Sequence, residues 1–150
     1  MTSILPVQLL RPEAVTPQKA HAGDLGFDLC AAQPAVILPG DWSSIQTGIA
    51  LALPFGCAGL ILPRSGLAAR LGVTVLNSPG LIDSGYRGEI GVILINWGDE
   101  PFHIQPGDRI AQLLIIGAQL PELAAVDVLP EAADERGAGG FGSSGGFSGA

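Results

Sequence analysis

Residues 43–62 read SSIQTGIALALPFGCAGLIL, two apolar runs separated by Pro54, Phe55 and Gly56. Pro and Gly interrupt strands and favour turns, so this stretch predicts a strand over 43–53, a tight turn and a second strand over 57–62. Short apolar runs alternate with Gly or Pro turns along most of the chain, about every eight to twelve residues. This spacing is typical of an all-β sandwich or barrel.

Further runs of the same kind predict strands over residues 4–10, 27–31, 35–38, 73–76, 89–96, 102–104, 108–116 and 122–128. One short helix is predicted over 65–71, because Ser65 is a suitable N-cap, Leu67 and Leu71 share a face, and Gly72 can end it. The runs AGLILP (58–63) and GVILIN (91–96) are apolar throughout instead of alternating, which predicts cover on both faces. In a chain of 150 residues we expect the second cover to come from another subunit.

The composition excludes several classes of function. The chain has 7 Lys and Arg against 14 Asp and Glu, a net charge of -7, so it has no overall field that would hold nucleic acid or an anionic membrane. It shows neither a membrane span nor a secretory signal, and we therefore expect a cytoplasmic protein. Cys30 and Cys57 are too few and too far apart for a disulfide framework, and we expect reduced, mostly buried thiols.

Five segments combine turn residues with chemically useful side chains. They are AGDLGFDL (22–29), PRSGLAARLG (63–72), NSPGLIDSGYRGEI (77–90), GDRIAQL (107–113) and the tail RGAGGFGSSGGFSGA (136–150). Each alone is weak evidence, because Gly-rich turns with Asp or Arg connect strands in any β protein. Their combination in one chain indicates a binding site.

In the third segment, Asp83 precedes the turn residues Ser84 and Gly85. Its carboxylate can act as a general base that orients a water, or it can accept local backbone hydrogen bonds, which is the more common role of an Asp before Ser-Gly. Backbone N–H and C=O groups of this hairpin can also read the edge of a nucleobase, and Asn77 can add a side-chain amide.

The second and fourth segments carry groups suited to anions. Arg64 and Ser65 lie at the predicted helix N-terminus, where free N–H groups favour phosphate. Ser65 is a poor candidate for a hydrolase nucleophile, because no G-x-S-x-G surrounds it. Arg109 and Gln112 are three positions apart in a predicted strand and should point to opposite faces.

The first and last segments are less regular. Asp24 and Asp28 resemble a fragment of a calcium loop, but its alternation and terminal Glu are missing, so we expect no all-protein metal cage. The tail is disordered by composition. Its arginine, aromatic and glycine amides could nevertheless form a lid that orders over a nucleotide.

In this order and at these separations, the five segments resemble the five motifs of the homotrimeric dUTP diphosphatases (dUTPases), over residues 22–145. The resemblance implies an all-β, jelly-roll-like β-barrel with one short helix and a C-terminal strand exchanged between subunits. It divides the chain into a barrel domain, 1–130, and a flexible arm, 131–150, that closes over the active site. It also implies a homotrimer whose three active sites are each assembled from all three chains.

The implied reaction is the Mg²⁺-dependent hydrolysis of dUTP to dUMP and pyrophosphate, which prevents uracil incorporation into DNA and supplies dUMP for thymidylate synthesis. One alternative is a dCTP deaminase of the same fold. Those relatives carry a catalytic Glu where this chain has Ile93, and they lack the R-G-x-G-G-F-G-S tail. A second alternative is a dUTP-binding regulatory protein.

The resemblance also assigns roles to individual residues. Asp83 orients the attacking water, Tyr86 lies under the deoxyribose and excludes a 2′-hydroxyl, and Asp28 holds water ligands of the magnesium. Uracil is read by Asn77 and by the backbone around Leu81, Ile82 and Gly91. The phosphate-contacting positions of the barrel are Arg64, Ser65, Gly66 and Gln112. In the tail, Arg136 is assigned to the terminal phosphate and Phe141 to stacking on the uracil ring. Gly142, Ser143 and Ser144 are assigned to further phosphate oxygens.

Overall fold

The computed structural model describes residues 4–131, which form strands and a single short helix. The elements are β1 (Val7–Leu9), β2 (Phe27–Cys30), β3 (Ala35–Ile37), β4 (Trp42–Gln46), β5 (Ile49–Leu51), β6 (Cys57–Leu62), α1 (Ser65–Leu71), β7 (Val73–Val75), β8 (Gly80–Asp83), β9 (Gly91–Asn96), β10 (Phe102–Ile104) and β11 (Arg109–Gly117). The all-β prediction with one short helix is therefore confirmed. The chain divides into two units at Leu120 and Pro121.

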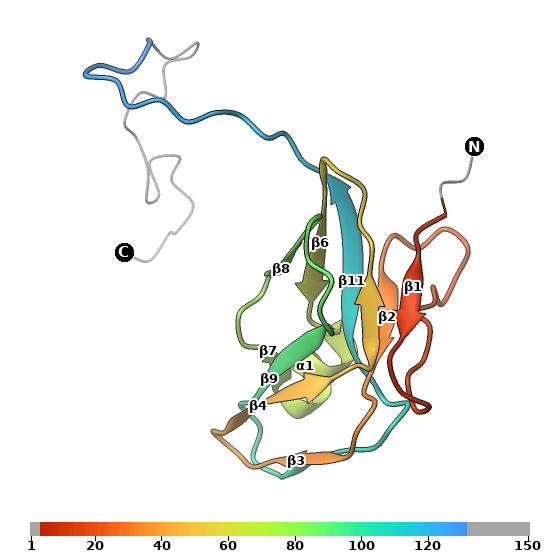
Figure 1. The fold of residues 1–150 in the computed structure, drawn as a ribbon. Coiled ribbons are helices and arrows are strands. Elements are labelled where there is room, and N and C mark those ends of the chain that lie inside the picture. The colour runs from red at the N-terminus through yellow and green to blue at the C-terminus, as the bar shows by residue number, and fades with distance from the viewer. Residues whose placement is uncertain (1–3, 132–150) are drawn as a thin grey trace, which may run out of the picture. The chain divides into compact units, whose positions relative to one another are not determined.

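Two antiparallel sheets form the body of the first unit. One has the strand order β2-β11-β6-β8 and the other β4-β9-β7, while β1 pairs with β5 and β10 with β3. Figure 1 shows the long strand β11 between β2 and β6, with β4 and β9 running across the lower end of that sheet. Sequence neighbours rarely pair in this arrangement, so most of the ladder contacts join distant parts of the chain.

The core lies between the two sheets. Leu29, Ile61 and Leu113 from the four-stranded sheet belong to the same buried cluster as Val92 and Leu94 from the other sheet. Each such side chain contributes about 1.5–3 kcal/mol on burial. The sheets therefore pack face to face, as in a sandwich.

The opposite face of the four-stranded sheet is apolar but incompletely covered. Leu60 and Leu62 alternate with the core residue Ile61 along β6, and both are only half-buried. Their cross-strand neighbours include Leu114 and Leu81, the latter 64% exposed. The continuously apolar sequence of β6 thus has one face in the core and one face that is incompletely covered, and cover of that second face by another subunit stays a prediction.

The expected strand over 43–53 is wrong in one respect, because it divides at Thr47 and Gly48 into β4 and β5. Gly48 has φ +70°, a conformation that favours glycine. The hydroxyl of Thr47, itself buried, donates to the Ile90 carbonyl at 2.6 Å. The chain therefore leaves the β4-β9-β7 sheet here and pairs with β1, a change that the run of apolar residues does not reveal.

Helix α1 matches the predicted range, and Gly72 ends it with φ +66° and an N–H bonded to the Ala68 carbonyl. The prediction that Ser65 caps the helix is wrong. Arg64 is the N-cap residue, it has extended backbone and no side-chain capping bond, and Ser65 is the first helical residue. The Arg64 side chain instead donates to the Arg109 carbonyl, outside the helix.

The expected strand over 122–128 is absent, since residues 118–131 contain no strand. Exchange of this segment between subunits stays a prediction, as does the division of the chain at residue 130. No helix among residues 4–131 is long and apolar enough to cross a membrane.

Candidate active site

A pocket of ≈ 200 Å³ opens beside β8 and the turn that follows it. Six residues assigned from the sequence to uracil, deoxyribose and the attacking water line this pocket: Asn77, Leu81, Ile82, Asp83, Tyr86 and Gly91. Ile61, Gly80, Glu89 and Ile90 complete the lining. The structure thus brings the predicted base-reading and water-orienting residues together.

Strand β8 positions the pocket wall through its pairing with β6. Gly80 is opposite Ile61, and a Cβ on Gly80 would lie 3.3 Å from the amide nitrogen of Asn77. A side chain at this position would require the Asn77 amide to shift by a few tenths of an ångström. Asp83 ends the strand with an exposed side chain, and its carbonyl accepts the Tyr86 N–H at 3.0 Å. This turn leaves the Asp83 carboxylate at the rim of the pocket.

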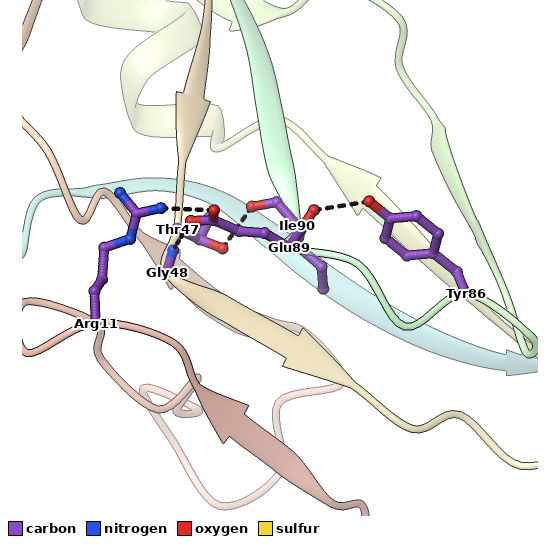
Figure 2. Close-up of polar contacts among 6 residues, drawn as sticks. All are labelled: Arg11, Thr47, Gly48, Tyr86, Glu89 and Ile90. Carbon is purple, nitrogen blue, oxygen red and sulfur yellow. Dashed lines mark hydrogen bonds and ion pairs between the residues drawn. The ribbon is translucent and has the colours of Figure 1, made fainter.

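Tyr86 is fixed by the turn that it belongs to. Its hydroxyl donates to the Glu89 carbonyl at 2.9 Å, as Figure 2 shows, and its side chain remains half-exposed toward the pocket. A Cβ on Gly88 would lie 2.6 Å from the ring atom Cζ. One side of the ring therefore packs directly on the Gly88 backbone. The rest of the ring stays half-exposed.

A second group of polar residues gathers at the other end of the four-stranded sheet. Asp28 on β2 lies 3.5 Å from Nε of Arg64 and 3.4 Å from Nη1 of Arg109. Nη1 of Arg64 also donates to the Arg109 carbonyl at 2.9 Å. One carboxylate thus orients two guanidinium groups, and we call these three residues the arginine cluster.

Gln112 belongs to the same face as the arginine cluster, because it is directly opposite Asp28 in the β2–β11 ladder. The prediction that Arg109 and Gln112 point to opposite faces is wrong. The register shifts between Arg109 and Ala111, where Ile110 and Ala111 are both buried. This irregularity inserts one residue and reverses the alternation, so both polar side chains face outward.

The other predicted phosphate contacts lie just beyond Arg64. Ser65 is exposed in the first turn of α1. A Cβ on Gly66 would lie 2.9 Å from Nη2 of Arg70, so Gly66 allows this arginine to lie over the helix start. Asp24 takes no part in the cluster, because its carboxylate accepts the His21 N–H within a local turn.

The two cysteines are free and half-buried, so they are less buried than predicted. Cys30 ends β2 next to the arginine cluster. Burial, and secondarily the negative charge of Asp28, raises the pKa of the Cys30 thiol. Its protonated form is therefore favoured near neutral pH.

The pocket and the arginine cluster are separated along β6. Asp83 is opposite Ala58, whereas Gln112 is opposite Leu62, four residues further along the strand. At the rise of a β-strand this spacing is about 13 Å. A single chain therefore presents the base-reading and phosphate-binding residues as two separate groups.

Five predicted site residues lie outside the described part of the chain: Arg136, Phe141, Gly142, Ser143 and Ser144. Conversely, sequence reasoning did not assign Arg109 or Glu89 to the site. Both residues lie inside the segments singled out from the sequence. Only the tertiary structure shows which groups their side chains contact.

A family model described as dUTPase matches residues 12–145. The chain belongs to the dUTPase family. Among curated relatives, the deoxyuridine 5'-triphosphate nucleotidohydrolase of Nocardia farcinica is 50% identical over 145 residues, covering 96% of this chain and 87% of the relative. The protein of the same description from Tropheryma whipplei is 53% identical over 140 residues, covering 93% and 94%.

Solved structures agree with this membership. A mutant of the Staphylococcus bacteriophage 80alpha dUTPase with bound dUpNHpp superposes with a TM-score of 0.89 at 31% identity, covering 96% of this chain and 99% of that one. A mutant dUTPase from phage phi11 of S. aureus, described with a structural Mg(II) ion, gives 0.79 at 28% identity, covering 84% and 98%. The jelly-roll fold class predicted from the sequence is thereby confirmed.

Proposed function

We propose that this chain hydrolyses dUTP to dUMP and pyrophosphate, and that the pocket beside β8 binds the deoxyuridine. The observation that carries the proposal is the lining of this pocket, where Asn77, Asp83 and Tyr86 meet around exposed hairpin backbone. The enzyme is a hydrolase of nucleotide metabolism, like the relatives to which it is about half identical.

The selection of uracil over cytosine follows from the polar groups that the wrong base leaves unpaired. The side-chain amide of Asn77 and the backbone of β8 offer a fixed pattern of donors and acceptors, and uracil matches it. Cytosine leaves polar atoms without partners, and each mismatch costs about 1–3 kcal/mol. Sugar selection is steric, because the Tyr86 ring occupies the space that a ribose 2′-hydroxyl needs.

Hydrolysis begins at Asp83, whose exposed carboxylate stands at the pocket rim. It accepts a hydrogen bond from a water placed in line with the α-phosphorus and takes its proton as the P–O bond forms. The α–β bridging bond breaks and pyrophosphate departs. The described guanidinium groups that face the phosphates are Arg64 and Arg109, and Gln112 adds an amide on the same face.

Magnesium fits as a partner of the triphosphate. Residues 4–131 contain no group of three or more His, Cys, Asp or Glu side chains able to hold a metal ion. Asp28 provides the carboxylate at the phosphate-binding end, but its two oxygens face Arg64 and Arg109. This donor set suits contact with the ion through its water ligands, and Mg²⁺ would neutralise phosphate charge.

The complete site requires more than one chain. The arginine cluster and the Asp83 pocket are separate along β6, and the half-exposed apolar face with Leu60 and Leu62 lies between them. A homotrimer that covers this face unites the two groups. The tail residues Arg136, Phe141 and Gly142 to Ser144 then complete phosphate and uracil contacts. Light scattering tests this assembly, and a monomeric mass would contradict it.

The deaminase alternative requires a carboxylate near the base. Ile93, the corresponding position, places an aliphatic side chain on β9 instead. The alternative of a dUTP-binding regulator gains no support from a specific contact of residues 4–131. The proposed enzyme acts in the cytoplasm without nucleic-acid or membrane partners, and its free cysteines suit a reducing compartment.

Chromatography of the products tests the function. The purified protein is incubated separately with dUTP, dCTP, dTTP and UTP, first with Mg²⁺ and then with a chelator. We expect metal-dependent conversion of dUTP alone to dUMP and pyrophosphate. A uracil nucleotide formed from dCTP would indicate a deaminase, and tight dUTP binding without products would indicate a regulator.

A further inference from the structure

The hydroxyl of Tyr86 donates to one carbonyl oxygen, that of Glu89, at 2.9 Å. The peptide unit that carries this oxygen also carries the N–H of Ile90, and that N–H donates to the Ile49 carbonyl at 2.9 Å. Because a peptide unit is planar and rigid, anchoring one side fixes the direction of the other. The Tyr86 hydroxyl therefore bonds to a peptide unit whose opposite side is fixed by the hydrogen bond to Ile49.

The Glu89 side chain anchors the same peptide a second time. Its Oε2 accepts Nη2 of Arg11 at 2.6 Å, and its Oε1 accepts the Gly48 N–H at 2.8 Å. Arg11 and Gly48 are 78 and 41 residues away in the sequence. Figure 2 shows the carboxylate between these two partners, with the Tyr86 hydroxyl bonded to the main chain of the same residue. Both carboxylate oxygens are thus used to tie the turn to two distant segments.

Close packing and hydrogen bonds fix the backbone at the β4–β5 junction, where this carboxylate binds. A Cβ on Gly48 would lie 2.8 Å from Cγ of Arg11, so the arginine stem packs directly on the glycine. The carbonyl of Ile90 accepts both the N–H and the hydroxyl of Thr47, at 3.2 and 2.6 Å. The ion pair itself is partly shielded, with 33% and 22% exposed side chains for Arg11 and Glu89. Charge-assisted bonds of this kind are stronger than neutral ones.

We propose that Glu89, paired with Arg11, is a positioning residue for Tyr86 and thereby sets the preference for deoxyribose over ribose. The inference rests on the proposed function, in which the Tyr86 ring lies under the sugar. Glu89 lines the pocket, but its carboxylate is bonded to Arg11 and Gly48 and acts through the tyrosine. Loss of the carboxylate lets the 86–90 turn move, and the ring then excludes the 2′-hydroxyl less well.

Kinetics with two substrates test the proposal. The selectivity is the ratio of kcat/KM for dUTP to kcat/KM for UTP. We expect Glu89→Ala to lower this ratio roughly tenfold and Arg11→Gln to lower it less, as for loss of one or two hydrogen bonds to a charged group. Glu89→Gln should lower it about as much as Arg11→Gln, because the amide oxygen can still accept the Gly48 N–H but the amide nitrogen cannot accept from Arg11. Glu13→Gln, which changes an exposed carboxylate two residues from Arg11, is the matched control and should leave the ratio unchanged.

A double-mutant cycle separates positioning from general destabilisation. If the carboxylate acts through the tyrosine hydroxyl, Glu89→Ala should have little further effect on the ratio once Tyr86→Phe has removed that hydroxyl. A full, additive loss in the double variant would overturn the proposal. An unchanged ratio in folded Glu89→Ala would also overturn it, and if this variant does not fold, Arg11→Gln gives the same test.

A spectroscopic measurement makes the inference independent of activity. Tyr86 is the only tyrosine of the chain, so 3-fluorotyrosine labelling places one ¹⁹F probe on the ring in question. We expect its resonance to shift or broaden in Glu89→Ala and Arg11→Gln but not in Glu13→Gln. An unchanged resonance in Glu89→Ala would overturn the inference even if dUTP hydrolysis is intact. Absence of dUTP hydrolysis in the wild type, with the ¹⁹F change present, would instead overturn the proposed function alone.

Discussion

The pocket beside β8 and the arginine cluster, to which we assign different parts of one substrate, are built by different means. The pocket is formed mainly by one continuous segment, 77–91, which includes the edge strand β8. The arginine cluster draws Asp28, Arg64 and Arg109 from three separate segments and joins them through charge. A region that must distinguish neutral bases needs fixed backbone geometry, whereas a region that binds phosphate needs positive charge that is oriented by a counterion.

The largest expected effect concerns Asp83, the carboxylate at the rim of the pocket. Asp83→Asn should lower kcat for dUTP by about 10²–10⁴-fold, because an amide cannot take the proton of the attacking water. Binding of a non-hydrolysable dUTP analogue, measured by calorimetry, should change little. Asp99→Asn, at an exposed position outside the pocket, is the control. Near-normal turnover in Asp83→Asn would contradict the role of Asp83.

A change in the arginine cluster should affect all triphosphates alike. Arg64→Lys removes both the guanidinium contact with Asp28 and the bond to the Arg109 carbonyl. We expect kcat/KM to fall by about 10–100-fold, since lysine cannot reproduce planar, multidentate contacts. The fall should be equal for dUTP and UTP, whereas a change in their ratio would show that the two regions are not independent.

A change in the pocket should instead affect dUTP and UTP unequally. Tyr86→Ala opens space at the sugar and should lower the preference for dUTP over UTP by about tenfold, mainly through an increase in UTP hydrolysis relative to dUTP. Steady-state kinetics with both substrates measure this ratio. If both substrates are affected equally, Tyr86 does not contact the sugar.

The smallest effect concerns the thiol beside the arginine cluster. Because the pKa of Cys30 is raised, its reactive thiolate should reach half of the population only above the ordinary value of 9.0. In a Cys57→Ser background, alkylation by iodoacetamide followed by mass spectrometry over a pH series should give a midpoint above that value. A midpoint below 9.0 would show that the nearby arginines outweigh burial and Asp28.

Local signals predicted several elements well. Residues 57–62 and 102–104 are strands with the predicted bounds, and Gly72 ends the predicted helix. The run at 43–53 failed, because a glycine between two apolar runs does not reveal whether the strand continues or changes its partner. The β8 strand was expected only as part of a turn-rich hairpin, and its pairing with β6 is a long-range event.

In the candidate site, too, local features could be predicted from the sequence and long-range contacts could not. The segment 77–91 is contiguous, so its pocket residues could be selected together from the sequence and from its resemblance to the dUTPases. Arg109 was placed on the wrong face because an irregularity in the ladder reverses the alternation. Glu89 was missed because its partners Arg11 and Gly48 are far away in the sequence, and no local pattern links them.

The sequence by itself determined the all-β class, the single helix, the family and the residues of the pocket, because turn chemistry, apolar runs and contiguous motifs are local properties. Only the tertiary structure decided which strands pair, which face Arg109 and Gln112 share, and which carboxylate anchors the turn that carries Tyr86. These depend on register, on one inserted residue and on ion pairs between distant segments. Such contacts are fixed by packing of the whole chain, so they appear only when the sheets are assembled.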